Sequence, residues 1–480
     1  MKTQNYIGGE WTDSPDKIEN INPSDTSDII GRFAQADAAQ LDAAVAAARE
    51  SQPRWAACGL EKRRAVLAAI GGELIARADS LGELLSREEG KPRAEGVGEV
   101  FRAGQFFEYY AAEVLRAPGE TADSVRPGVE IDVHREPVGV VGIISPWNFP
   151  MATACWKIAP ALAFGNSVIW KPANLTPASA TAFAEIFAAQ DAPAGVFNLV
   201  MGAGGAIGEK IAGHPEIDAV SFTGSLQTGR KIAAAAARNL TKLQMEMGSK
   251  NPLVIMDDAD IDLAVRHAAA GAFGGTGQKC TASSRLIAHR RIYDEFADKL
   301  AAAAKAIKVG HALDSQTQMG PAASRAQLQS NLNYMKIAKE ENAELLCGGD
   351  PPRAAHDGYY MSPVLFAGDN AMRINREEMF APIACVIAAD SYEHALHIAG
   401  DTEYGLVSGI MTRSLARAAH FRRNIKTGCV MINLPTAGTD YHVPFGGRKN
   451  SSHGAREQGR AAAEFYTAVK TSYICAGAPE

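Results

Sequence analysis

From about residue 138, short runs of β-branched and other apolar residues alternate with alanine-rich stretches of helical character. The runs read VGVVGII, SVIWK, VFNLV, DAVSFTG and KLQMEMG, and this alternation predicts a βαβ series. Because apolar residues are nearly continuous within each run, we expect a parallel sheet with helices on both faces. A nucleotide binds such a sheet at the carboxyl ends of its strands, so cofactor binding is the first hypothesis.

A second series of the same kind runs from NPLVIMDD through SSRLIAH, YYMSPVLF and VSGIMT to GCVMINL. It predicts a second α/β domain, which suits a chain of 480 residues because single cores rarely grow to that length. The first hundred residues are expected to be helical after a short extended start, with Asp37 and Gln40 spaced as in a capping box. A buried helical stripe is expected at Val66, Leu67, Ile70 and Leu74.

Charge and cysteine content exclude several classes of protein. Lys plus Arg number 48 against 54 for Asp plus Glu, without dense runs of one sign, so neither nucleic acid nor a membrane is expected as a partner. The seven cysteines are scattered, and the pair His394 and His397 lacks a third ligand, so we expect no metal site and a reducing compartment. The start lacks a signal-peptide pattern and no apolar run reaches about 20 residues, which favours a cytoplasmic protein.

Cys280 differs from the other cysteines in its surroundings. It lies in GGTGQKCTASSR among small and polar residues, next to Lys279. A structural cysteine normally lies in an apolar run, which is how we interpret the other six. The flanking glycines allow close backbone approach, and the setting favours a reactive thiolate, so Cys280 is the candidate nucleophile.

Two further residues suit the chemistry of such a nucleophile. Glu246 lies between two methionines in LQMEMGSKNP, where partial desolvation would raise its pKa towards that of a general base. A solvated glutamate at a strand end is an equal alternative from these residues alone. Asn148 lies between two prolines in IISPWNFP and suits an oxyanion donor, although these residues alone favour a turn cap.

Residues near two other strand ends suit a nucleotide. Lys171 ends SVIWK directly before Pro172, so its ammonium is expected at the carboxyl edge of the sheet, near ribose or phosphate. In SFTGSLQTG, a strand-to-helix turn with Gly224, Ser225 and Gly229 suits a pyrophosphate at a helix N-terminus. Each signal is weak alone, because solvated lysines and glycine turns are common.

Seven motifs, PWNFP, WKPAN, SFTGS, EMGSKNP, GQKC, EEMFAP and PFGGRKNSS, occur in the order found in the aldehyde dehydrogenase superfamily. The chain resembles this superfamily from GGEW to EFYTAVKT. The resemblance implies that Cys280 is the nucleophile, Glu246 the general base and Asn148 the oxyanion donor. It implies that the thiolate attacks an aldehyde, hydride passes to a nicotinamide, and the resulting thioester is hydrolysed.

The resemblance also implies a set of cofactor-binding residues. Lys171 would hold ribose or phosphate, and Ser225 would contact the pyrophosphate. Glu378 and Phe380 in EEMF would position the nicotinamide ribose and ring. The other members of the set are Trp147, Gly224 and Gly229.

Two positions depart from the family pattern. NAD-specific members usually have a glutamate where this chain has Asn174, which would not repel a 2′-phosphate, so NAD or NADP is expected as cofactor. Ala381 replaces a glycine of the family motif, a small change that is expected to leave Glu378 in place.

Three segments, EMGSKNP, GAFGGTGQKCTASSR and VPFGGRKNSSHGAREQGRAAAEFYT, look most like the subgroup that oxidises 2-oxoglutarate semialdehyde (2,5-dioxopentanoate). A dehydrogenase for succinate semialdehyde or another ω-carboxy aldehyde is the alternative. The sequence does not identify the residue that would meet the distal carboxylate, and Lys279 is the positive group expected nearest to it. The residues implied to line the substrate tunnel are Phe149, Trp156, Lys279, Thr281 and Phe445.

The resemblance implies an aldehyde dehydrogenase-like α/β fold in three parts. Residues 1–117 and 137–247 would form a Rossmann-like NAD(P)-binding domain, and residues 248–446 a catalytic domain. Residues 118–136 and 467–480 would form a small oligomerisation element, because VEIDVHREP alternates as an edge strand does and KTSYICA could extend a partner's sheet. A homodimer or homotetramer is expected.

Two other classes of function are compatible with the same fold. One is a non-catalytic scaffold, since a fold does not guarantee activity, but a scaffold has no need of Cys280, Glu246 and Asn148 together. The other is an enzyme that passes the acyl group to coenzyme A. That branch generally lacks the base, so Glu246 favours hydrolysis.

Overall fold

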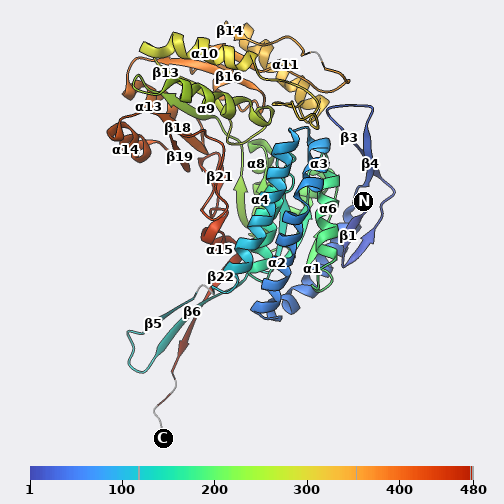
Figure 1. The fold of residues 1–480 in the computed structure, drawn as a ribbon. Coiled ribbons are helices and arrows are strands. Elements are labelled where there is room, and N and C mark those ends of the chain that lie inside the picture. The colour runs from blue at the N-terminus through green and yellow to red at the C-terminus, as the bar shows by residue number, and fades with distance from the viewer. Residues whose placement is uncertain (117–118, 353, 476, 478–480) are drawn as a thin grey trace.

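The computed structural model describes residues 1–116, 119–352, 354–475 and 477, and these residues form two large sheets and three small ones (Figure 1). The centre of the first large sheet consists of β9 (Phe197–Leu199), β8 (Ser167–Lys171), β7 (Val140–Ile144), β10 (Ala219–Thr223) and β11 (Lys242–Glu246), in this order. These five strands run parallel, which confirms the predicted βαβ series. Antiparallel strands extend its two edges: β1 (Asn5–Ile7) and β2 (Glu10–Thr12) beside β9, and β21 (Ser452–His453) beside β11.

Helices cover both faces of this sheet, as expected for strands that are apolar throughout. Val141 and Ile143 of β7 point to one face, and Val140 and Ile144 point to the other. The first face packs with α2 (Leu60–Ala76), α3 (Ala78–Glu89), α4 (Arg93–Glu113), α5 (Ala152–Ala163) and α6 (Pro177–Ala188). The second face packs with α1 (Ala38–Ala57), α7 (Glu209–Gly213) and α8 (Leu226–Ala236).

The N-terminal helices form largely as the sequence predicts. The Asp37 carboxylate accepts a hydrogen bond from the Gln40 N–H at 2.9 Å and caps α1. The Gln40 side chain donates to the carbonyl of Asp13 instead of turning back to the cap, so only half of the predicted capping box is present. The expected stripe of α2 is buried at Val66, Leu67, Ile70 and Leu74.

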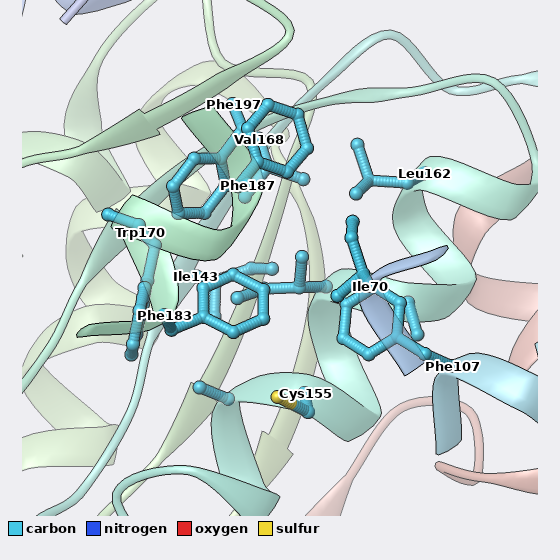
Figure 2. Packing of buried hydrophobic residues seen from close by; sticks show 14 of the residues in the cluster. Ile70, Phe107, Ile143, Cys155, Leu162, Val168, Trp170, Phe183, Phe187 and Phe197 are labelled. Carbon is cyan, nitrogen blue, oxygen red and sulfur yellow. The ribbon is translucent and has the colours of Figure 1, made fainter. Parts of the chain in front are cut away.

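Aromatic rings fill the core between the first sheet and α6 (Figure 2). Trp170 of β8 and Phe197 of β9 meet Phe183 of α6, with ring centroids 5.6 Å and 5.5 Å from it. The Trp170 indole N–H donates to the Ser145 hydroxyl at 2.8 Å, which satisfies the buried donor. This contact fixes the carboxyl ends of β7 and β8, where a nucleotide is expected.

The second large sheet has the order β14 (Glu344–Cys347), β15 (Val364–Ala367), β16 (Ile383–Ala389), β13 (Ser283–His289), β12 (Asn251–Ile255), β18 (Val407–Met411) and β19 (Cys429–Ile432). It is parallel except at the edge strand β14. The sequence predicted all but β14 and β16. The run IACVIAA of β16 is rich in alanine, the strongest helix former, which conceals a central strand.

Helices pack against this sheet as well, and shorter elements complete the chain. The helices are α9 (Ile261–Phe273), α10 (Tyr293–Lys305), α11 (Arg325–Glu340), α12 (Arg373–Arg376), α13 (Tyr392–Gly400) and α14 (Leu415–Asn424). Two small sheets pair β3 (Lys17–Ile21) with β4 (Ile29–Ala34) and β17 (Tyr404–Gly405) with β20 (Arg448–Lys449). The short helix α15 (Ala463–Tyr466) precedes the final strand.

The third small sheet projects away from the rest of the chain (Figure 1). It consists of β5 (Gly119–Asp123), β6 (Glu130–Pro137) and β22 (Thr467–Ile474), all antiparallel, with β6 in the centre. The hairpin and the final strand are therefore those expected, although residues 117, 118, 476 and 478–480 of the predicted ranges lie outside the described residues. The role of this sheet in oligomerisation and the division into domains stay predictions.

In the described part of the chain, no helix combines the length and the apolar character that crossing a membrane requires.

Candidate active site

Cys280 lies in a turn that leads from α9 into β13, and its backbone is held from two sides. Gly277, three residues before it, has φ +65°, and a Cβ there would lie 2.0 Å from the carbonyl oxygen of Ala381, so only glycine fits. At the other side, the Asn251 side-chain amide donates to the carbonyl of Cys280 at 2.8 Å. The position of the thiol is therefore set by β12 and by the segment that follows Phe380.

Cys280 is partly exposed and lies where two cavities meet. The first cavity, of about 730 Å³, is bounded by α4, α9 and residues 435–439. The second, of about 310 Å³, lies at the carboxyl ends of β7, β10 and β11 and extends to residues 378–380. Cys280, Phe149 and Trp156 line both cavities. A sulfur atom in this position can face one molecule in each of them.

Most of the predicted site residues line these cavities. The second cavity is lined by Trp147, Asn148, Phe149, Trp156, Gly224, Ser225, Cys280, Glu378 and Phe380. The first cavity is lined by Phe149, Trp156, Lys279, Cys280, Thr281 and Phe445, which are all the residues expected to line a substrate tunnel. The predicted residues that line neither are Glu246, Lys171, Asn174 and Gly229.

Asn148 is buried after the end of β7, and both its side chain and its backbone are held by hydrogen bonds. Its side-chain nitrogen donates to the carbonyl of Gln278 at 2.9 Å, two residues before Cys280. The Lys91 ammonium donates to its backbone carbonyl at 2.5 Å. One hydrogen of the Asn148 amide nitrogen is therefore engaged, and the other is available beside the thiol-bearing turn.

Glu246 ends β11 and is buried, and it lines neither of the two cavities. One carboxyl oxygen accepts from the Ser452 hydroxyl at 2.5 Å, and the other accepts from the Gln244 amide at 3.2 Å. Burial and then the charge of Glu457 raise the pKa of Glu246 well above its usual range. Glu246 is desolvated as expected, and its carboxyl group is engaged by Ser452 and Gln244.

The surroundings of Cys280 favour its protonated form in the absence of a bound ligand. Burial, and then the charges of Glu246 and Glu378, raise the pKa of the thiol to about 12. Lys279 does not compensate for these charges, because its ammonium lies 3.0 Å from the Glu95 carboxylate and is neutralised by it.

The end of the second cavity beside β10 has the features of a phosphate site. Ser225 is the N-cap of α8, and its hydroxyl accepts from the Thr228 N–H at 3.3 Å. A Cβ at Gly224 would lie 2.6 Å from the ring of Phe222, so this turn leaves no room for a larger residue. Backbone N–H groups at the start of α8 therefore face an open crevice, as in anion sites at helix N-termini.

The other end of this cavity carries two aromatic rings and a carboxyl group. Trp147 and Phe380 pack edge to face with centroids 5.4 Å apart. Glu378 accepts from the Ser249 N–H at 2.9 Å, and burial raises its pKa to about 7. Flat apolar walls beside one strong acceptor suit a ring and a ribose hydroxyl.

Of the predicted residues that line neither cavity, Gly229 lies against the border of the second one, and Lys171 and Asn174 have partners of their own. The Lys171 ammonium donates to the Pro172 carbonyl at 2.7 Å, and burial lowers its pKa to about 8. A Cβ at Gly229 would lie 2.5 Å from the sulfur of Met247, which itself lines the crevice. Asn174 donates to the Gln35 side chain at 3.0 Å.

Sequence reasoning missed several residues that line the first cavity, including Glu95, Arg102, Phe106 and Gln458. Glu95, Arg102 and Phe106 lie on α4, far from any motif, and only the packing of α4 against the catalytic turn brings them there. The helical spacing of residues 95, 98, 99, 102 and 106 on one face was the available signal.

A doubly covered parallel sheet, with a thiol at a cavity on its carboxyl edge, is the arrangement of an α/β enzyme with a nucleophile beside a nucleotide site. The chain belongs to the aldehyde dehydrogenase family, whose model matches residues 11–472. It is therefore an NAD(P)-dependent oxidoreductase, as the sequence predicted.

Individual relatives cover the chain almost completely. An alpha-ketoglutaric semialdehyde dehydrogenase of Bacillus subtilis (strain 168) is 40% identical over 98% of this chain and 97% of its own. An alpha-ketoglutarate semialdehyde dehydrogenase of Haloferax volcanii is 38% identical over 98% of each. A crystal structure of betaine aldehyde dehydrogenase from Staphylococcus aureus in complex with NAD+ superposes with a TM-score of 0.97, at 33% identity over 100% of this chain and 96% of that one. The predicted fold class is confirmed.

Proposed function

We propose that this enzyme oxidises 2-oxoglutarate semialdehyde to 2-oxoglutarate through a thioester on Cys280, with NAD or NADP as cofactor. The observation that carries the proposal is the position of Cys280 between a wide cavity and a crevice suited to a dinucleotide. Two relatives at 40% and 38% identity are named for this activity, which supports the choice of substrate.

Cys280 acts as the nucleophile. Its proton leaves for water in the cavity before addition, because the thiolate and not the thiol attacks a carbonyl. The new bond joins the sulfur to the aldehyde carbon and places negative charge on the former carbonyl oxygen. The free hydrogen of the Asn148 amide and the backbone N–H of Cys280 stabilise this oxyanion.

Four residues of the crevice and its border hold the cofactor. The N-terminus of α8 at Ser225 would bind the pyrophosphate, Glu378 would accept from a nicotinamide ribose hydroxyl, and Phe380 would pack against the ring. Lys171 binds a ribose or phosphate oxygen, which would replace its hydrogen bond to Pro172 and favour its charged form. A nicotinamide bound here would supply the acceptor for the hydride of the aldehyde carbon, which leaves a thioester on Cys280.

Glu246 acts as the base that releases the product. It takes a proton from a water molecule, the oxygen of that water adds to the thioester carbonyl, and the bond between carbon and sulfur breaks to give the acid and free Cys280. The Glu246 carboxyl group must turn from Ser452 towards Cys280 for this step. Its raised pKa makes it a stronger base than an exposed glutamate.

The cofactor preference depends on Asn174, and we expect Asn174→Glu to favour NAD. A carboxylate there would repel a 2′-phosphate and accept from a ribose diol, so kcat/KM with NADP is expected to fall at least about tenfold while the value with NAD is kept. Initial rates with each cofactor measure the change. Asn174→Gln is the matched control for size. An equal loss with both variants, or none with either, would place the 2′ position elsewhere.

A substrate panel tests the proposed function. The purified enzyme is given aldehydes of two to six carbons, with and without a terminal carboxylate, and reduced cofactor is followed at its absorbance band. The highest kcat/KM is expected for 2-oxoglutarate semialdehyde. A higher value for succinate semialdehyde or another ω-carboxy aldehyde would replace the substrate, and oxidation of none would refute the function.

We also propose that the enzyme is a cytoplasmic homodimer or homotetramer. β5 and β22 are the edges of the projecting sheet, and β22 carries the exposed side chains of Val469 and Tyr473. Unpaired strand edges with exposed apolar groups are suited to extending a partner's sheet.

A further inference from the structure

One side of the first cavity is a face of α4 that carries charged groups. The residues of α4 that line it include Glu95, Glu99, Arg102 and Phe106. Glu99 is buried and bound to the Lys91 ammonium at 2.6 Å, so its charge is balanced within the protein. The charge that this face of α4 offers to a ligand therefore depends on Glu95 and Arg102.

Two cations line the cavity, and they differ in their partners. The Lys279 ammonium is paired with the Glu95 carboxylate at 3.0 Å. The Arg102 guanidinium forms no ion pair or hydrogen bond with any residue in the described part of the chain. It lies over the ring of Tyr441 at 5.3 Å, a cation–π contact that orients the group without neutralising it.

A second polar group of the same cavity also lacks a partner. Gln458 is 1% exposed and lines the cavity, and its side-chain oxygen has no hydrogen-bond partner among the described residues. Its backbone has φ 63° and ψ 167°, a conformation that costs a residue other than glycine free energy. Buried polar atoms without partners are rare in native proteins, and this oxygen is an acceptor, so it suits a donor such as water or a hydroxyl, whereas a carboxylate needs the Arg102 donors.

We propose that Arg102 is the residue that binds the distal carboxylate of the substrate and so selects anionic aldehydes. This inference rests on the proposed function, because it assigns the far end of the same site. A planar guanidinium can pair with a carboxylate through two parallel hydrogen bonds, and stacking on Tyr441 fixes its plane in advance. The sequence favoured Lys279 for this role, but its pairing with Glu95 leaves little charge for a ligand.

The test compares an anionic and a neutral aldehyde of equal chain length, 2-oxoglutarate semialdehyde and pentanal, in the full-length enzyme with cofactor. Arg102→Gln is expected to lower kcat/KM for the semialdehyde about 10- to 100-fold, mainly through KM, and to change pentanal less than about twofold. Arg102→Lys should restore part of the lost kcat/KM, because lysine keeps the positive charge but cannot form two parallel hydrogen bonds with the carboxylate. Arg93→Gln is the matched control, since Arg93 begins the same helix at an exposed position.

Binding is measured separately from turnover. Glutarate is expected to slow the alkylation of Cys280 by iodoacetamide in the wild type and in Arg93→Gln, but not in Arg102→Gln at the same concentration.

If Arg102→Gln keeps both the protection and the ratio of kcat/KM for the two aldehydes, the assignment of Arg102 is overturned while the proposed function stands. If the wild type fails to oxidise the semialdehyde but the protection depends on Arg102, the substrate is wrong and the carboxylate site is retained. Loss of protection in Lys279→Gln alone would move the site to Lys279 and overturn the proposal.

Discussion

Replacing Cys280 with alanine is expected to abolish aldehyde oxidation, with kcat lowered at least about 10,000-fold. The reason is that the sulfur makes the covalent bond to the substrate, and no other cysteine lines either cavity in the described part of the chain. Cofactor binding should be retained, because the α8 terminus, Glu378 and Phe380 are untouched. Steady-state rates and a cofactor titration by protein fluorescence measure the two properties.

The matched control is Cys58→Ala, because Cys58 is also partly exposed but lies at the end of α1, outside both cavities. It should keep wild-type activity. Full activity in Cys280→Ala would refute the thioester mechanism. A loss accompanied by a lower melting temperature and weaker cofactor binding would instead indicate that the alanine disturbed the turn after Gly277.

The sequence predicts the first sheet of this fold well because its signals are local and repeated. Runs such as VGVVGII and SVIWK are nearly continuous in apolar residues, and alanine-rich helices separate them. The sequence therefore predicts both the strands and their parallel direction. In the second sheet the same reasoning fails at β16, where alanine makes a central strand resemble a helix. β16 is buried like the strands of the first sheet, so the difference lies in its amino-acid composition.

The candidate site is predictable only as far as its residues lie in motifs. Asn148 follows β7, Ser225 precedes α8 and Cys280 lies in the turn before β13, and the topology of the two sheets brings them to the same cavity. Arg102 reaches the site from a helix with no motif. The partners of a side chain are also beyond sequence reasoning: Glu246 is desolvated as expected, but its hydrogen bond to Ser452 was not predicted.

Replacing Glu246 with glutamine is expected to separate the two halves of the reaction. Acylation of Cys280 does not need the base, so a rapid burst of about one reduced cofactor per active site should appear on mixing. Hydrolysis then lacks its base, and steady-state turnover should fall about 100- to 10,000-fold. Stopped-flow absorbance resolves the two phases. Hydroxylamine, which attacks a thioester without a base, should restore part of the turnover.

The pH dependence gives an independent measure of the same role. Burial and Glu457 raise the pKa of Glu246, so its basic form is scarce at low pH and increases as the pH rises through that value. In the wild type, hydrolysis of the thioester should therefore become faster as the pH rises through the pKa of Glu246. The slow phase of Glu246→Gln should lose that dependence. Glu464→Gln, at an exposed position of α15, is the matched control and should keep both rate and profile. If Glu246→Gln is slow without a burst, the carboxyl group acts before the thioester forms. The proton on Cys280, held by a pKa of about 12, would then be the one that Glu246 removes.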